Sequence, residues 1–506
     1  MYFFSFSIKE EGDLVKDINI DESILVKRMI VTFSVLSIMF ILWSQLTHLN
    51  SYAASYDQVD FALALDRFDL MAMQPHFPGY PYFILGGLIV HLFVNDQVSS
   101  LTLFNILFYF SACIPMYLLV RDYLSKTHGI LLTAICYSST YLVISVNQPM
   151  SEGAALAAFS WYFWSLVNSL KKNDLLSTIL PLFLLSVLLG IRLSYLPFTV
   201  GLLILLYKKR KSRQFSSKKV IYSLLIAGIF QFIWVFALVI SEGNLKGFIK
   251  LSLAFTSGHF NNWGNTVVAD NQSIFERIKI VAFDNLLWTG LTAQTVVIAV
   301  IYILLFGLFI FRLKRFHFIT DHTMQFAILM GGAYFIWALF AQNSDKPRHI
   351  LPVILLLIFI LFYNLLKESR NILTYLLCII LLIAQSYSSF KLLKRQISEV
   401  PATIQLANYL KKNEQSSIVY TWEETRVFDY ENVQVPHKQI ETYDFFLHDQ
   451  SYYKNKKILL TNKVVEGFKE QGNDLSGKIK VIREFKSDPI FDPVYDEVVL
   501  YEWVNQ

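Results

Sequence analysis

Long uncharged apolar stretches alternate along the chain with short segments that hold most of its charged residues. Most stretches run for about 18 to 26 residues, the length at which an α-helix crosses roughly 30 Å of hydrocarbon. A soluble protein would have to bury every one of them in a core, so the pattern predicts an α-helical polytopic membrane protein. We expect about eleven transmembrane helices, at 29–47, 98–120, 128–146, 152–170, 175–191, 194–207, 220–241, 286–311, 322–341, 349–366 and 371–390.

Two further segments flank or interrupt these spans. Residues 80–94 are apolar but too short to cross, so we expect them to be interfacial or re-entrant. Residues 1–28 carry mixed charge and no cleavable signal pattern, which predicts a cytoplasmic tail before a signal-anchor helix. The transmembrane domain is therefore expected at 29–390.

The pattern changes in residues 391–506, where charge rises and long apolar runs disappear. Short apolar runs at 417–420, 457–460 and 497–501 predict strands, and helical patterns are found near 402–412 and 463–470. This region is predicted to be a small α/β domain. It contains no Gly-rich phosphate loop or metal motif, so we expect a recognition or structural role.

Composition agrees with a membrane protein, since 54% of the residues are hydrophobic and only 16% are charged, against about a quarter charged in soluble chains. All three cysteines, Cys113, Cys136 and Cys378, lie inside apolar spans. That placement argues against a disulfide framework or a cysteine metal site.

The basic residues are divided unequally between the two sets of loops, and cytoplasmic loops are the richer set in membrane proteins. If 80–94 does not cross, the loops around 121–126, 171–172, 208–219, 312–315 and 367–370 share one side and carry most of the Lys and Arg. We therefore expect a cytoplasmic N-terminus and an extracytoplasmic C-terminal domain. The outward segments are then 47–97, 147–151, 242–285 and 342–348.

The outward loop 47–97 holds the densest polar chemistry and is expected to contain interfacial helices. Residues 58–70 have helical periodicity, with Phe61, Leu65 and Phe68 on one face and Asp57, Asp60 and Arg67 on another. Asp57 suits a general base facing a cavity at the membrane surface. The alternative is a helix cap, with Asp60 favoured by the helix dipole. The proline-rich run 75–81, which includes His76, would be rigid and suits either a site or a plain re-entry turn.

Two charged residues lie at the ends of predicted spans. Glu152 begins the span 152–170, where it is either a functional acid or a first-turn acid favoured by the helix dipole. Arg192 lies between two short spans. A charge at membrane depth is costly and marks a functional candidate, whereas the alternative is a side chain that snorkels to the interface.

Two more outward segments suit the recognition of a phosphate and a sugar. Lys346 and Arg348 place donors near the outer interface, where they would bind a phosphate or simply anchor the helix. His259 and Trp263 lie in the amide-rich run 258–265. Such a run suits sugar hydroxyls and ring faces, and it equally suits any ordered loop.

Taken in order, these motifs resemble the bacterial type C (GT-C) glycosyltransferases, polytopic enzymes related to the protein O-mannosyltransferases and to the aminoarabinose transferase of lipid A. The run Tyr56-Asp57-Gln58 departs from the more usual Trp-Asp-Ser of that family but keeps the carboxylate. The resemblance extends over most of 29–390, in the family's order, through the runs 56–65, 74–81, 150–153, 190–195, 258–265 and 346–352.

The resemblance implies a hexosyltransferase of the plasma (inner) membrane. It would move a sugar from a polyprenyl-phosphate donor to an extracytoplasmic glycan, lipid or protein acceptor. Asp57 would be the general base of an inverting single displacement. We expect no cofactor, no obligatory metal, because the first loop lacks an Asp-x-Asp pair, and no nucleic-acid partner. The implied donor-phosphate ligands are Arg192, Lys346 and Arg348, and the implied substrate-binding residues are Asp60, His76, Glu152, His259 and Trp263.

Two other functions fit a chain of many apolar helices. A transporter or lipid flippase predicts inverted repeats and broken helices at the bilayer midplane, but no internal repeat occurs and the polar groups gather on one outer face. A scaffold or receptor would bind a partner through the C-terminal domain. It predicts that Asp57 lies buried among apolar side chains, far from Arg192 and Arg348.

Overall fold

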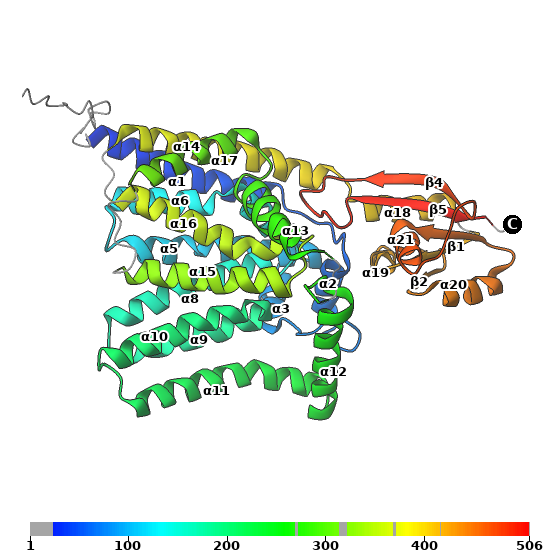
Figure 1. Ribbon diagram of the computed structural model, residues 1–506, viewed down its shortest axis with the longest axis horizontal. Coiled ribbons are helices and arrows are strands. Elements are labelled where there is room, and N and C mark those ends of the chain that lie inside the picture. The colour runs from blue at the N-terminus through cyan, green and yellow to red at the C-terminus, as the bar shows by residue number, and fades with distance from the viewer. Residues whose placement is uncertain (1–23, 269–271, 313–320, 368–370, 415, 505–506) are drawn as a thin grey trace, which may run out of the picture.

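The computed structural model describes residues 24–268, 272–312, 321–367, 371–414 and 416–504. Most of its helices lie side by side in one bundle, and a separate α/β domain sits at one end of that bundle (Figure 1). The tail predicted at 1–28 lies outside the described residues up to residue 23. The helices of the first part are α1 (Ile24–Thr47), α2 (Tyr56–Asp66), α3 (Pro81–His91), α4 (Gln97–Ser111), α5 (Cys113–Val120), α6 (Lys126–Tyr137), α7 (Thr140–Val146), α8 (Glu152–Lys171), α9 (Leu175–Ile191), α10 (Thr199–Lys211), α11 (Ser217–Ser241), α12 (Leu245–Gly258), α13 (Ile274–Ile278), α14 (Val296–Arg312), α15 (His322–Ala341), α16 (Leu351–Lys367) and α17 (Ile372–Ser398), with 3₁₀ turns at Leu193–Phe198 and Pro347–Ile350 and π-helical segments at His259–Trp263 and Lys279–Leu291.

Each predicted span coincides at least in part with a helix. Fewer than eleven of these helices, however, are long and apolar enough to be identified as membrane spans. Among the described residues, six helices are long and apolar enough to cross a membrane, and two bent pairs raise the number to eight. The predicted spans at 152–170, 175–191 and 194–207 are helical but do not meet that criterion. The total of eleven spans therefore stays a prediction.

Two predicted spans are broken by bends. The helices α6 and α7 meet at 58°, where Ser138 donates to the side chain of Gln385 at 3.0 Å. The span predicted at 286–311 is bent more sharply, since the π-helical segment and α14 meet at 107°. At that bend Ala293 and Gln294 have φ angles of 47° and 56°. Such positive φ angles end a helix.

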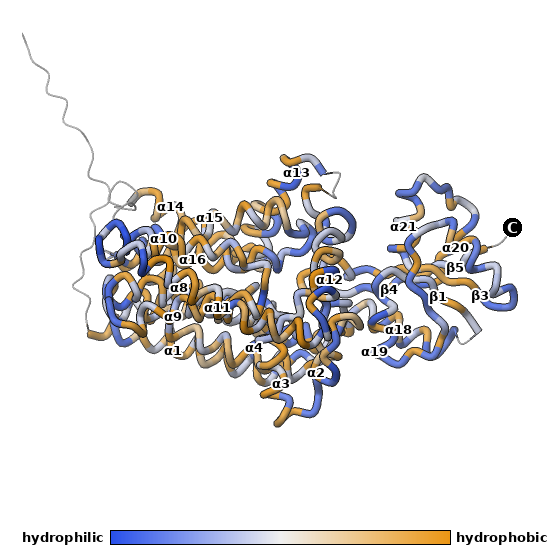
Figure 2. The backbone as a smooth tube through the Cα atoms, turned by 90° about the horizontal axis from the view of Figure 1, so that it is seen from below, coloured by the Kyte–Doolittle hydropathy of each residue, from blue (hydrophilic) through white to orange (hydrophobic). Residues whose placement is uncertain are grey.

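The basic loops predicted to share one side lie together at one end of the bundle. Lys209 donates to the carbonyl of Lys172 at 3.0 Å, and Lys208 approaches His322 at 3.2 Å. Lys367 pairs with Asp321 at 3.2 Å. This hydrophilic end is opposite the end that carries the C-terminal domain (Figure 2). Lys314, Arg315 and Arg370 of the same set lie outside the described residues.

The C-terminal domain is a five-stranded mixed sheet between two layers of helices, which agrees with the predicted α/β domain. The strand order is β2-β1-β3-β5-β4, with β2, β1 and β3 parallel and β5 antiparallel to both of its neighbours. Successive residues of β1 face opposite layers, so that Val419 joins one core and Ile418 and Tyr420 the other. The elements are α18 (Ala402–Asn413), β1 (Ser417–Thr421), α19 (Glu424–Tyr430), β2 (His437–Gln439), α20 (Tyr443–Gln450), β3 (Lys457–Thr461), α21 (Asn462–Glu470), β4 (Ile479–Lys486) and β5 (Glu497–Trp503).

The domain packs directly on the loop at 47–97, which was predicted to face outward. Helix α17 continues past residue 390 to Ser398 and leads into α18. Thr403 of α18 donates to the carbonyl of Ala54 at 2.7 Å. A small apolar core seals the contact, and its buried members are Ala53, Val59, Ala62, Val98, Ile404 and Val427. The side of the loop that carries α2 is therefore covered by the C-terminal domain.

Candidate active site

Asp57 lies in the first turn of α2 and is bound by an arginine from a distant part of the chain. The N-cap position belongs to Ser55, so the interpretation of Asp57 as a cap is wrong. Its Oδ2 accepts a hydrogen bond from Nη2 of Arg348 at 2.8 Å. The carboxylate is half-buried, with 31% of the side chain exposed. It is thus both held in place and open to an incoming molecule.

Arg348 and Arg192 are joined by the carboxylate of Glu152. Nε of Arg348 lies 3.2 Å from Oε1 of Glu152, and Nη2 of Arg192 lies 3.1 Å from the same oxygen. Arg192 also donates to Oγ of Ser151 at 2.8 Å. A continuous chain of charges, Arg192–Glu152–Arg348–Asp57, therefore runs through the site. We call these four residues the ion cluster.

The ion cluster is assembled from element ends. Glu152 is the first residue of α8, Arg192 follows α9, and Arg348 stands in the 3₁₀ turn before α16. The Glu152 side chain is 1% exposed and that of Arg192 is 9% exposed. Arg192 is turned inward, so the interpretation as a snorkelling residue is wrong. Buried charges persist only when paired, and here each arginine has a carboxylate.

The electrostatics around Asp57 favour its ionised form. Burial opposes ionisation, but Lys346, His76 and Arg348 outweigh it and hold the pKa of the Asp57 carboxyl well below its usual range. Nδ1 of His76 lies 4.0 Å from Oδ1 of Asp57. The positive groups near Asp57 therefore form a region of cationic potential suited to an anion.

Asp60 and His76 lie beneath Asp57 and are held by a residue that sequence reasoning missed. Asp60 is fully buried, with one oxygen 3.2 Å from Nδ1 of His76 and the other accepting from Nε of Arg426 at 2.8 Å. Arg426 belongs to α19 of the C-terminal domain, and its Nη2 donates to the carbonyls of Ala72 and Met73 at 2.9 and 3.0 Å. Arg426 belongs to no sequence motif that would mark it as a site residue, so its role is visible only in the fold.

His259 and Trp263 lie outside the ion cluster. Nε2 of His259 is 3.0 Å from the carbonyl of Ala341. The ring of Trp263 packs against Phe255, which in turn stacks on His76 with 6.0 Å between ring centroids. An aromatic row therefore connects Trp263 to the site, whereas the imidazole of His259 contacts the end of α15.

The described part of the chain contains no group of three or more His, Cys, Asp or Glu side chains placed to hold a metal ion. Asp57 is bound by Arg348, and Asp60 is bound by His76 and Arg426. Independence of the reaction from metal stays a prediction.

The sequence matches no known protein family and no curated protein. The structure resembles ArnT from Cupriavidus metallidurans bound to undecaprenyl phosphate, with a TM-score of 0.55, 11% identity, and coverage of 94% of this chain and 98% of that chain. Its apo form gives a TM-score of 0.53 at the same identity and coverage. The apo oligosaccharyltransferase of Archaeoglobus fulgidus gives 0.47 at 11% identity, covering 87% of this chain and 70% of that chain. The resemblance to ArnT shows that the chain has the GT-C fold, as the sequence motifs predicted.

Proposed function

We propose that this protein is a glycosyltransferase of the plasma (inner) membrane that transfers a sugar from a polyprenyl-phosphate donor to an extracytoplasmic acceptor. The observation that carries the proposal is the 2.8 Å contact between Asp57 and Arg348 within the ion cluster. A base and an anion-binding group then stand side by side at one end of a membrane bundle. A lipid-linked donor is supported by the likeness to ArnT, which was crystallised with undecaprenyl phosphate.

In the proposed reaction, Asp57 takes the proton of an acceptor hydroxyl as its oxygen attacks the anomeric carbon. The new glycosidic bond forms while the bond from that carbon to the phosphate oxygen breaks, which inverts the configuration. The electron pair leaves with the polyprenyl phosphate. Arg348, Arg192 and Lys346 stabilise its growing negative charge.

Arg348 couples the donor to the base. While it is paired with Asp57, the low pKa of the carboxyl makes it a weak base. A donor phosphate competes for the same guanidinium, since arginine binds phosphate and carboxylate oxygens in the same way. Transfer of Arg348 from Asp57 to the phosphate raises the proton affinity of Asp57, so donor binding activates the base.

Asp60 takes a different role from the substrate contact that its sequence position suggests. Both of its carboxylate oxygens are occupied, by His76 and by Arg426, and it has no exposed surface. We assign Asp60 and His76 as positioning residues that fix α2 beneath Asp57. Sugar contacts by His259 and Trp263 remain part of the proposal, with Trp263 46% exposed.

The alternative functions agree less well with the site. A scaffold requires no link between Asp57 and the arginines, yet Asp57 contacts Arg348 directly. A transporter is distinguished by its product. We expect full-length protein in proteoliposomes, supplied with radiolabelled polyprenyl-phosphate hexose and membrane acceptors, to form a new glycosidic bond. Movement of intact donor between leaflets without any such bond would identify a flippase instead.

A further inference from the structure

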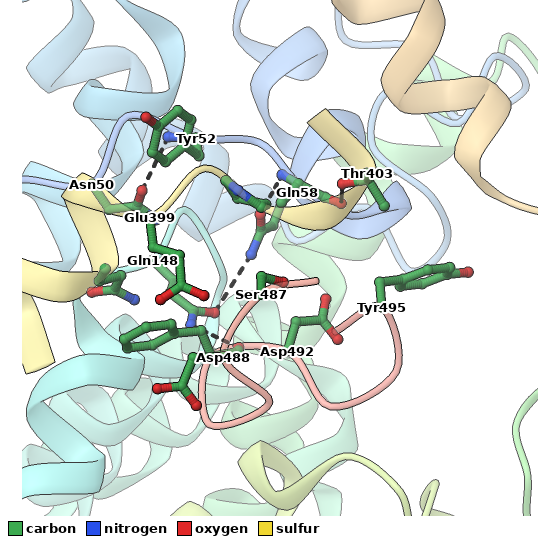
Figure 3. A pocket seen from close by; sticks show the side chains of 14 residues that line it. Asn50, Tyr52, Gln58, Gln148, Glu399, Thr403, Ser487, Asp488, Asp492 and Tyr495 are labelled. Atoms are coloured by element: carbon green, nitrogen blue, oxygen red, sulfur yellow. Dashed lines mark hydrogen bonds between the residues drawn. The ribbon is translucent and has the colours of Figure 1, made fainter. Parts of the chain in front are cut away.

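A polar pocket lies at the junction between the first outward loop and the C-terminal domain (Figure 3). It is partly open to solvent. Gln58 and Gln148 line the side of the bundle, and Glu399 lies just past α17. The loop before β5 supplies the opposite wall, which contains Asp488, Asp492 and Tyr495.

The pocket adjoins the ion cluster. Gln58 directly follows Asp57 on α2, and its Nε2 lies 3.5 Å from Oε1 of Gln148. Gln148 belongs to the turn that leads into Glu152, and Asn105 fixes that turn by donating to the carbonyls of Gln148 and Met150 at 2.8 and 2.7 Å. The pocket therefore reaches the residue next to the proposed base, although Asp57 itself does not line it.

The C-terminal domain also extends this wall toward Asp57. The hydroxyl of Tyr495 donates to Glu423 at 2.6 Å. Burial raises the pKa of Glu423, Lys346 opposes the rise, and the charges of Asp57 and Asp492 add to it. Glu423 is thus near both the pocket carboxylate and the base.

The residues that line the pocket suit the binding of hydroxyl groups, and their charge is mainly negative. Glu399 and Asp488 share Arg395, at 2.9 and 2.5 Å. Asp492 has no ion-pair partner within the described ranges, and one oxygen accepts from the backbone N–H of Val494 at 3.1 Å. Carboxylates and amides accept hydroxyl and ammonium protons, whereas a phosphate would meet like charge.

We propose that this pocket binds the acceptor, and that the acceptor is a neutral or amine-bearing glycan rather than a phosphorylated molecule. The inference rests on the proposed transferase function and adds its acceptor class. Charge then separates the two substrates, because the donor phosphate binds the arginines and the acceptor hydroxyls bind the acidic wall. The C-terminal domain is accordingly part of the active site.

Binding of three trisaccharides to the full-length protein in nanodiscs tests this inference. The probes are maltotriose, the trimer of glucosamine, and maltotriose phosphorylated at C6, with affinities measured by saturation-transfer NMR. We expect the first two to bind and the third to bind at least about tenfold more weakly. Asp492→Lys should weaken maltotriose binding about tenfold, and Asp492→Asn should weaken the glucosamine trimer more than maltotriose. Glu484→Gln, on exposed strand β4, is the matched control.

Each outcome of this experiment decides the proposal. Equal binding by wild type and both Asp492 variants, preference for the phosphorylated probe, or no binding of any probe overturns the pocket as a glycan site. Transfer to membrane acceptors, measured in the same preparation, separates this from the transferase function. If the protein transfers sugar but binds no trisaccharide, the transferase function stands and the pocket is not a glycan site. If it binds trisaccharides but transfers no sugar, the pocket is not an acceptor site.

Discussion

Arg426 of the C-terminal domain donates to Asp60 of α2 at 2.8 Å, and Asp60 has no exposed surface. The two residues are 366 positions apart. Arg426 also binds the carbonyls of Ala72 and Met73, so a single side chain fixes both ends of the loop segment that positions Asp57. The C-terminal domain is therefore a structural support of the site as well as a cover.

Removing this arginine should destabilise the protein. Arg426→Gln leaves a buried carboxylate with one partner fewer, which typically costs about 3–5 kcal/mol. The double variant Arg426→Gln/Asp60→Asn removes the charge as well and should recover part of the loss. Thermal and denaturant unfolding in detergent measures both. A single variant within about 0.5 kcal/mol of wild type would show that the pair contributes little.

His76 should make stability depend on pH. Burial lowers its pKa, but the hydrogen bond to Asp60 and the charge of Asp57 outweigh it and raise the pKa above the ordinary 6.5. A raised pKa contributes stability that is full below the unfolded value and is lost as pH rises through the folded value. Unfolding temperatures of wild type should therefore fall relative to His76→Gln above about pH 6.5. A constant difference between the two proteins across that range would contradict the assignment.

Arg348 should control both the rate and its pH dependence. Arg348→Gln removes a donor to the leaving phosphate and should lower kcat by about a hundredfold or more. It also removes one of the cations that hold the pKa of Asp57 down in the free enzyme, so the acidic limb of the kcat/KM profile should move to higher pH.

Arg348→Lys is the matched control for that experiment. It keeps the charge but loses the fork that reaches Asp57 and Glu152 together. We expect a smaller shift of the acidic limb than in Arg348→Gln. If kcat fell but the acidic limb of the pH profile did not move in either variant, Arg348 would not control the pKa of Asp57.

The fold class could be predicted because length and lack of charge define a membrane helix. The bends could not be predicted, because the hydropathy averaged over a long apolar stretch changes little when the stretch contains a few polar residues. Ser138, Ser139 and the run 292–295 were the local signals. In the C-terminal domain, β1, β3 and β5 were predicted from short apolar runs, whereas β4, with mostly exposed residues, was missed.

The site was predictable only in part. Asp57 and Arg348 are 291 positions apart, and no spacing rule joins them. They were found as candidates through the ordered resemblance to a family, and as partners only through the structure. Asp60 was expected to bind substrate, as the resemblance implied. It is buried because α19 of a later domain covers its side of α2.

Sugar transfer by Asp57 variants tests the central claim most directly. Full-length wild type, Asp57→Asn and the control Asp66→Asn, at the exposed end of α2, would be compared in proteoliposomes with radiolabelled polyprenyl-phosphate hexoses. We predict transfer by wild type and Asp66→Asn, and a loss of at least about a hundredfold in folded Asp57→Asn. Equal transfer by all three proteins would contradict the account, because Asp57 would then not be the base.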